Sequence, residues 1–332
     1  MDNFWQKLKP SARGGRPILA LAPMAGITDS AFRQVCKGFG ADVVYSEMAS
    51  VAALCYNPKK TLATLTSDKK EAPYVIQLFG SDPKHFERAV KLLTDKRRFS
   101  KFKIPASPAG GKNSKLPQGL DINFGCPVKK VAKQGAGAVL MDSPERAREI
   151  VKAVLDSTDL PVSIKIRSKV GATTALKFLD GLSALPLAAV MIHGRPMSAG
   201  HSGPVDWQMI KEARNHFGGV ILANGGAVDR QSALDLLRKT GADGLGIARG
   251  ALGKPWLFQQ ILNFKFKILN REEVFKIALK HAKLTEKLKG GAGIIEMRKH
   301  LCWYVSGLPG ATELRRRLVA VNDLAEIKKI LK

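Results

Sequence analysis

Short apolar runs alternate with amphipathic stretches along roughly the first 250 residues. The runs are rich in valine, isoleucine and leucine and are bounded by glycine, proline or polar residues, which is typical of buried strands. Eight of them are predicted strands, at residues 16–22, 42–47, 74–79, 119–124, 162–167, 188–193, 220–223 and 244–248. Helices are expected between them at about 28–37, after Pro83, and at 143–155, 173–182, 207–215 and 230–239. This alternation and length predict an α/β fold, a (β/α)8 TIM barrel.

The strand–helix rhythm stops after about residue 262, and the rest of the chain has only helical patterns. These patterns cover 272–289, 293–305 and a stretch within 312–331, with glycines between them. The last 70 residues carry 16 lysines and arginines against 7 acidic residues, so they are about twice as basic per residue as the first 262. We therefore predict a barrel over 1–262 and an all-helical domain over 263–332 that offers an anion-binding surface.

The whole chain is strongly basic, with a formal net charge of +26. Such a charge favours a polyanionic partner, most commonly a nucleic acid, although a basic proteome would have the same effect. The chain opens with polar and basic residues, and it contains no apolar run long enough to span a bilayer. We expect a cytoplasmic protein without a membrane partner.

The four cysteines lie far apart and form neither a Cys-x-x-Cys motif nor a cluster with histidine. This spacing argues against a metal site and against a disulfide framework. Reduced thiols and no bound metal are therefore expected.

Nearly every predicted strand ends in polar residues. Burying a polar side chain in an apolar strand costs free energy, so these residues are unexpected in a purely structural role. In a barrel these ends open at one mouth, where catalytic groups lie. The strand ends carry Pro23-Met24-Ala25, Glu47-Met48, Gln77, Asn123 with Cys126, Lys165 with Arg167, His193 with Arg195, Asn224-Gly225-Gly226, and Arg249-Gly250. The glycine turns at 224–226 and 246–250 follow the seventh and eighth strands, where barrels commonly hold a phosphate.

The segment 119–141 is the candidate for the chemistry. Its strand must stop before Pro127, which cannot donate to a sheet, so Cys126 lies on a stiff loop. Lys129, Lys130 and Lys133 follow it. A free cysteine is often only a small buried hydrophobe, so the residue type alone leaves a structural role open.

The segment 96–118 contains seven basic residues and no acidic one. It joins the helix predicted after Pro83 to the fourth strand, so we expect it on the barrel face opposite the mouth. A solvated insertion is favoured there over a contact with RNA.

Several motifs, in this order, resemble the tRNA dihydrouridine synthases: APMAGITDSAFR, IQLFGSDP, DINFGCPVKKVAKQGAGAVLM, IKIR, IHGR, NGG and IARGALGKPWLF. The final MRKHLCWYVSGLPG is similar to the bacterial B-type branch. The length of the 96–118 insertion departs from the family pattern, and NGG stands where some members have NGD. The resemblance implies an enzyme that binds flavin mononucleotide (FMN) and reduces the C5–C6 double bond of uridines in tRNA, with NADPH or NADH as the reductant. It also favours a monomer.

The resemblance also implies residue roles. Hydride would reach C6 of the uracil, and Cys126 would donate the proton to C5. The residues expected to bind the flavin are Pro23, Met24, Ala25, Gln77, Lys165, His193, Asn224, Gly225, Gly226, Ala248 and Arg249, the last five of them at its phosphate. The residues expected to bind the substrate are Asn123, Lys129, Lys133, Arg167 and Arg195.

Two alternatives remain open at this stage. A flavin barrel that acts on free pyrimidines, similar to dihydroorotate dehydrogenases, would share the hydride and cysteine chemistry but would not explain the basic tail. A non-catalytic RNA-binding protein on the same barrel would bind tRNA and hold no flavin. An affinity for tRNA that falls steeply with salt, together with a flavin, would favour the synthase.

Overall fold

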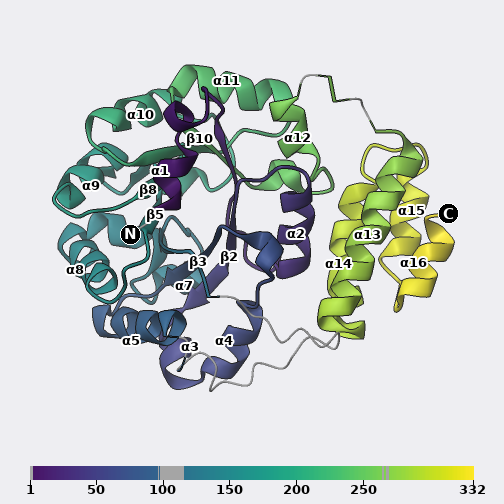
Figure 1. Cartoon of the computed structure of the whole chain (residues 1–332), viewed down its shortest axis with the longest axis horizontal. Coiled ribbons are helices and arrows are strands. Elements are labelled where there is room, and N and C mark those ends of the chain that lie inside the picture. The colour runs from purple at the N-terminus through teal and green to yellow at the C-terminus, as the bar shows by residue number, and fades with distance from the viewer. Residues whose placement is uncertain (1–2, 96, 98–115, 264, 267–268) are drawn as a thin grey trace.

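The computed structural model describes residues 3–95, 97, 116–263, 265–266 and 269–332. Eight parallel strands close into a barrel in which each strand pairs with its neighbours, and the last pairs with the first (Figure 1). The strands are β1 Ile18–Leu21, β2 Val43–Ser50, β3 Tyr74–Phe79, β4 Gly119–Phe124, β5 Val162–Arg167, β8 Ala189–His193, β9 Val220–Asn224 and β10 Gly244–Ile247. The predicted (β/α)8 barrel is confirmed.

Helices follow the strands and surround the barrel (Figure 1). They are α2 Ser30–Gly38, α3 Val51–Tyr56, α4 Pro58–Thr64, α5 Pro83–Thr94, α8 Pro144–Leu155, α9 Ala175–Leu182, α10 Trp207–Glu212, α11 Arg230–Thr240 and α12 Leu257–Leu262. The sequence did not predict α3 and α4. The helix predicted from residue 173 begins at Ala175, because a hairpin of β6 Lys169–Val170 and β7 Thr173–Thr174 takes its first two positions.

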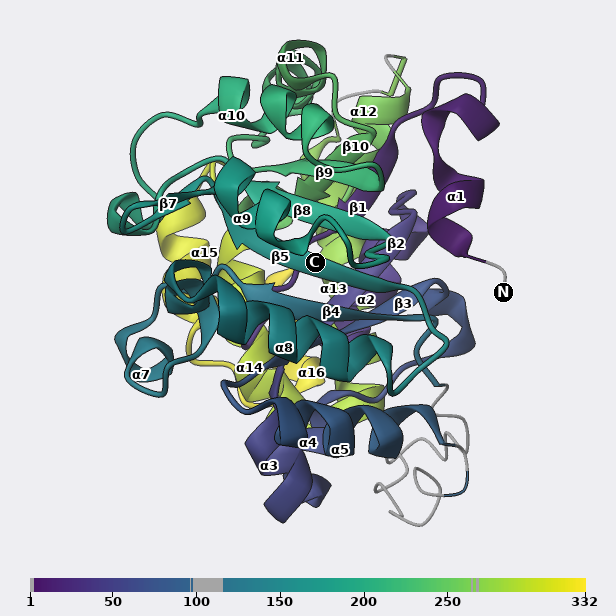
Figure 2. The same cartoon turned by 90° about the vertical axis from the view of Figure 1, so that its left-hand side faces the viewer.

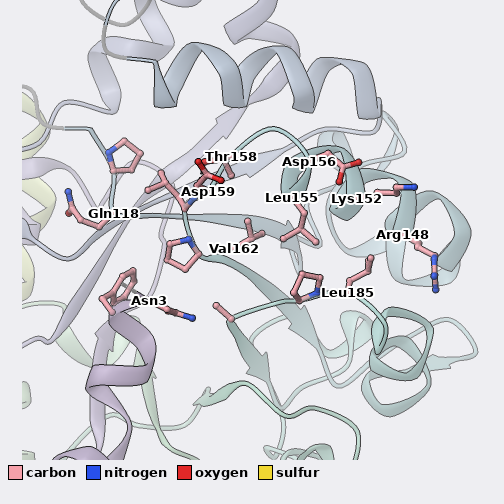
Figure 3. A pocket seen from close by; sticks show the side chains of 16 residues that line it. Asn3, Gln118, Arg148, Lys152, Leu155, Asp156, Thr158, Asp159, Val162 and Leu185 are labelled. Atoms are coloured by element: carbon pink, nitrogen blue, oxygen red, sulfur yellow. Dashed lines mark hydrogen bonds between the residues drawn. The ribbon is translucent and has the colours of Figure 1, made fainter. Parts of the chain in front are cut away.

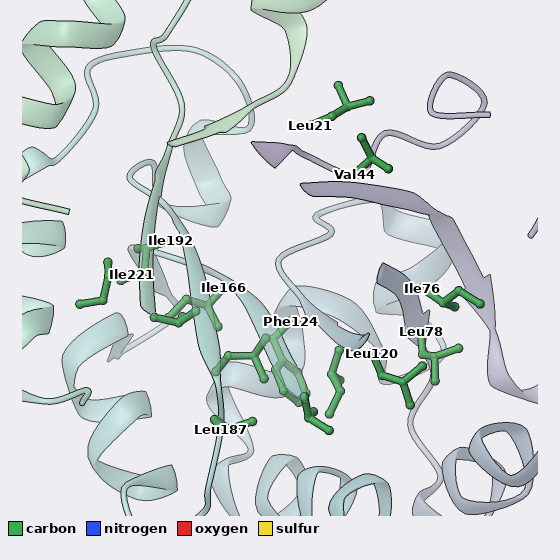
Figure 4. Close-up of a cluster of buried hydrophobic side chains, with 14 of the residues drawn as sticks. Leu21, Val44, Ile76, Leu78, Leu120, Phe124, Ile166, Leu187, Ile192 and Ile221 are labelled. Atoms are coloured by element: carbon green, nitrogen blue, oxygen red, sulfur yellow. The ribbon is translucent and has the colours of Figure 1, made fainter. Parts of the chain in front are cut away.

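The outward side chains of the strands pack against the helices, and the two ends of the barrel are covered by different elements. Outward side chains such as Leu21, Ile76, Phe124 and Ile192 belong to the large apolar cluster that joins the strands to the helices (Figure 4). The helix α1 Phe4–Leu8 lies at the amino ends of the strands, where Trp5 is fully buried (Figure 2). The helix α7 Lys129–Ala132 and the β6–β7 hairpin lie at the opposite end (Figure 2). That carboxyl end is the mouth of the barrel.

Four helices form the C-terminal part beside the barrel: α13 Arg271–Lys289, α14 Gly291–Tyr304, α15 Ala311–Leu318 and α16 Leu324–Ile330 (Figure 1). The third predicted tail pattern thus contains two helices. These helices enclose their own apolar cluster, which Trp256 from the end of the barrel joins. The C-terminal helices are confirmed, while the domain boundary at 262/263 stays a prediction.

The C-terminal helices contact the barrel through α2. Lys289 Nζ lies 2.7 Å from the Asp29 carboxylate, and the Phe32 ring stacks on His281 with ring centroids 5.6 Å apart. Burial acts to raise the pKa of Asp29, but the Lys289 charge and its hydrogen bond outweigh burial and lower that pKa to about 2. Lys299 also donates to the carbonyl of Gly26, in the loop after β1. The tail therefore reaches the rim of the mouth.

None of the helices that the structure describes is long and apolar enough to cross a membrane. Within the described residues, no three histidine, cysteine or acidic side chains gather as a metal site would require. Most of the basic insertion at 96–118 lies outside the described residues, so its predicted position stays a prediction. Its last residues, Pro117 and Gln118, lead into the amino end of β4.

Candidate active site

The strand ends bring most of the predicted site residues to the mouth of the barrel. In the registered parallel strands, Asn123 pairs with Lys165, Arg167 pairs with His193, and His193 pairs with Asn224. Side chains on one face of neighbouring strands lie side by side, so these residues form a polar arc across β4, β5, β8 and β9. Gln77 lies deeper in β3 and is buried at 1% exposure.

The loop that carries Cys126 is held on both sides. Asn123 Oδ1 accepts from the backbone N–H groups of Gly125 and Cys126, at 3.0 and 2.9 Å. The N–H of Ala138 donates to the Cys126 carbonyl at 3.0 Å. Gly137 has a positive φ of 71°, and a Cβ there would lie 2.8 Å from that carbonyl, so only glycine fits the turn. The half-buried thiol of Cys126 therefore has a defined position at the mouth.

Arg167 is 1% exposed, and its guanidinium holds loops at the mouth. Its Nε donates to the Gly125 carbonyl at 3.0 Å, and Nη1 donates to the carbonyls of Pro196 and Gly200. The sequence prediction gave Arg167 a contact with the substrate, and that role stays a prediction. Its observed contacts join the loop of Cys126 to the loop after β8.

Positive charge accumulates beside this loop. Burial, followed by the Arg167 charge, lowers the pKa of Lys165 to about 8, against the opposing effects of Asp121 and Cys126. Burial and then Lys165, Arg167 and Arg195 lower the pKa of His193 to about 2. His193 is therefore neutral at physiological pH, whereas Lys165 is mostly charged. A site of this kind favours an anionic ligand.

The two predicted phosphate loops adjoin His193. Gly225 and Gly226 have φ values of 101° and 83°, and a Cβ on Gly225 would lie 2.7 Å from the His193 ring. A Cβ on Gly250 would lie 2.1 Å from the carbonyl of Ala227, so the loop after β10 packs on the loop after β9. Asn224 Nδ2 donates to the Gly246 carbonyl at 2.6 Å and ties the two strands together. Glycine is therefore required for these contacts.

The other predicted residues lie around the rim. Arg249 is exposed, and its Nη2 donates to the His201 carbonyl at 3.0 Å. Arg195 donates to the Gly203 carbonyl at 2.7 Å, and its Nη1 lies 3.5 Å from His193 Nε2. The remaining members are Pro23, Met24 and Ala25 after β1, Ala248 after β10, and the exposed Lys129 and Lys133 at α7.

Sequence reasoning missed Asp121, which is fully buried inside the barrel. It accepts from Gln77 Nε2 at 2.7 Å and from Ser163 Oγ at 2.6 Å. Burial raises the pKa of Asp121 to about 6 despite these hydrogen bonds. A signal existed, because Asp121 is a polar residue in an apolar strand, as are Gln77 and Lys165.

A hollow of about 830 Å³ lies at the other end of the barrel (Figure 3). Charges of both signs line it, including Arg148, Lys152 and Asp159, and it contains none of the predicted site residues. The hollow lies at the amino ends of the strands, whereas barrel enzymes use the carboxyl ends. The candidate active site is therefore the mouth and not this hollow.

Fold and site together define a (β/α)8-barrel protein with a fixed thiol loop and an excess of cationic groups at its mouth. The sequence model that describes the dihydrouridine synthase (Dus) family matches residues 20–101 and 109–332 of the chain. The chain belongs to the dihydrouridine synthase family.

Proteins with similar sequences support this assignment. The chain is 31% identical over 318 residues to a probable tRNA-dihydrouridine synthase 1 of a Synechocystis species, covering 93% of this chain and 84% of that protein. It is 32% identical over 319 residues to tRNA-dihydrouridine synthase B of Pseudomonas aeruginosa, covering 92% and 89%. Among solved structures, a histamine dehydrogenase from a Rhizobium species matches with a TM-score of 0.53 at 12% identity, covering 94% of this chain and 61% of that one. That last likeness concerns the fold alone.

Proposed function

We propose that this protein reduces the C5–C6 double bond of uridines in tRNA, using bound FMN that NADPH or NADH re-reduces. The observation that carries the proposal is the fixed loop of Cys126 beside the cationic group of Lys165, Arg167 and Arg195. Membership of the dihydrouridine synthase family and the names of the relatives support the substrate.

The residues at the mouth fit FMN. Burial and the neighbouring charges of Lys165, Arg167 and Arg195 lower the pKa of His193, and an anion such as a phosphate or a reduced flavin would offset this excess of positive charge. Gly225 and Gly226 have positive φ values of 101° and 83°, and Arg249 lies on the loop after β10, which packs on their loop. A phosphate bound to these glycines and to Arg249 would combine backbone donors with a charge-assisted partner.

FMN held by these residues would supply the hydride for C6 of the uracil. Lys165 stays mostly charged at neutral pH, because its pKa is about 8, and it stabilises negative charge in the ligand. Neutral His193 offers a hydrogen bond without adding a charge. The thiol of Cys126, on the loop that Arg167 holds through the Gly125 carbonyl, donates its proton to C5.

The surface around the mouth fits an RNA substrate. Within the described part of the barrel, the exposed large apolar side chains are Tyr56, Val128, Trp207 and Val228, at 73%, 52%, 41% and 55% exposure. All four follow the carboxyl end of a strand, on the side of the mouth. Exposed apolar groups beside lysines suit unstacked bases and phosphates, and a target base must leave its stack to be reduced.

The proposal is tested by incubating the purified protein with FMN, NADPH and an unmodified tRNA transcript. We expect uridine nucleosides that are two hydrogen atoms heavier in a mass spectrum of the digested RNA. Orotate or free uracil serves as the competing substrate for the dehydrogenase alternative. Reduction of the free pyrimidine without reduction of tRNA would contradict the proposal.

A further inference from the structure

A chain of buried hydrogen bonds runs from the centre of the barrel to the loop of Cys126. Asp121 Oδ2 accepts from Gln77 Nε2 at 2.7 Å, and Gln77 Oε1 accepts from Asn123 Nδ2 at 2.9 Å. Asn123 Oδ1 then accepts from the N–H groups of Gly125 and Cys126. Asp121, Gln77 and Asn123 are no more than 7% exposed, so water does not replace these bonds easily.

The direction of this chain is set at its inner end by Asp121 and at its outer end by the two N–H groups of the loop. An amide side chain can turn over and exchange its oxygen with its nitrogen, so Gln77 and Asn123 have no direction of their own. An ionised carboxylate accepts only, and the pKa of about 6 leaves Asp121 ionised at neutral pH. Its oxygens therefore draw the amide nitrogen of Gln77 inward, which turns the oxygen of Gln77 toward the Asn123 nitrogen.

The last link has a consequence for the loop. With its nitrogen toward Gln77, Asn123 presents its oxygen to the two backbone N–H groups of the loop. The opposite orientation would set donors against donors and leave buried N–H groups unpaired, which is costly. The amide nitrogen of Asn123 also lies 3.7 Å from Met48 Sδ, so its polar atoms are fully engaged within the protein.

We propose that Asp121 is a positioning residue, which sets the direction of the Asp121–Gln77–Asn123 chain and thereby holds the loop that carries Cys126. This role deepens the proposed function, on which its catalytic consequence rests. Asp121 itself stays beneath the mouth and touches no substrate. The structural part, the direction of the chain, does not depend on the reaction.

A reversal experiment tests the direction. Asn123→Asp places Gln77 between two carboxylates. At a pH where both carboxylates are ionised, the amide oxygen of Gln77 faces an acceptor whichever way it turns. Adding Asp121→Asn supplies a donor at the inner end. The two side-chain links through Gln77 can then form in the reverse direction, while the carboxylate at position 123 still accepts from the two N–H groups of the loop. The matched control adds Asp121→Ala to Asn123→Asp instead, which removes the same charge but supplies no donor.

Two readouts are measured on the full chain: the midpoint temperature of unfolding, and kcat and KM for tRNA. We expect Asn123→Asp to lower the midpoint by several degrees and kcat at least tenfold. Asp121→Asn should recover more than half of both losses, and Asp121→Ala should not. Equal recovery by alanine and asparagine would overturn the proposal, because relief of charge would then explain it.

A second comparison tests the proposal if the Asn123→Asp variant does not fold. In the otherwise native chain, Asp121→Asn can still accept from Gln77 and donate to Ser163, so it should keep kcat within about threefold. Asp121→Ala should lose at least tenfold, and equal kcat for the two would contradict the role. If the wild-type protein forms no dihydrouridine, the proposed function fails, while the midpoint temperatures still decide the direction of the chain.

Discussion

Mild acid should weaken the contact between the barrel and the C-terminal helices through His281. This side chain is fully buried, its Nδ1 lies 3.2 Å from the Tyr304 hydroxyl, and its Nε2 has no hydrogen-bond partner among the described residues. Burial lowers the pKa of His281 to about 4, from the usual histidine value of about 6.5, although the nearby Asp29 opposes the shift. The folded protein therefore keeps this histidine neutral.

The sign and size of the effect follow from proton linkage. Between pH 6.5 and 4 the unfolded chain binds a proton that folded His281 does not, so stability falls as the pH falls. The two pKa values correspond to about 2 kcal/mol of stability lost from this group between pH 7 and pH 5. Asp29, with a pKa of about 2, contributes stability that is lost only below about pH 4, outside this window. His193 and His300, whose pKa values are also lowered, act in the same direction as His281.

The assay is urea unfolding followed by tryptophan fluorescence at pH 7, 6 and 5. The comparison variant is His281→Asn, whose amide can replace Nδ1 as the partner of Tyr304 and does not titrate. We expect the variant to be less stable at pH 7 and to lose about 2 kcal/mol less than the wild type between pH 7 and pH 5. The same pH dependence in both proteins would refute the reasoning.

Three further predictions concern the mouth. Cys126→Ser should lower product formation by about 10²-fold or more while flavin content is kept, and Cys302→Ser should not; equal turnover in the two variants would exclude the acid role. Arg249→Ala should weaken FMN binding about tenfold in a titration, as expected for a lost charged hydrogen bond, whereas the exposed Arg238→Ala should leave it unchanged. Tyr56→Ala should raise KM for tRNA at least fivefold, because stacking of a base on an aromatic ring contributes about 1–3 kcal/mol. Tyr56→Phe keeps the ring and should leave KM unchanged. An unchanged KM in the alanine variant would exclude stacking.

The barrel could be predicted from sequence because its signals are local. Each strand is a short apolar run that ends in glycine, proline or polar residues, and β3, β4 and β5 have the bounds that the pattern predicts. Because the carboxyl ends of barrel strands meet at one mouth, the sequence also predicted that His193 and Asn224 lie near each other. The register of β8 and β9 confirms that they do.

What the sequence did not predict depends on contacts across space. The role of Arg167 in joining two loops needs the distance between the ends of β4 and β8, which no local pattern contains. The contact of Phe32 with His281 joins residues about 250 positions apart. Asp121 was visible as a polar residue in an apolar strand, but its link to Cys126 runs through side chains of two different strands.

The most direct test of the proposed function is the flavin absorbance of the purified, FMN-loaded protein under anaerobic conditions. We predict that NADPH bleaches the flavin spectrum and that uridine-containing tRNA restores it, whereas free pyrimidine does not. A protein that holds no flavin even after reconstitution with FMN, or a reduced flavin that tRNA leaves bleached, would contradict the account.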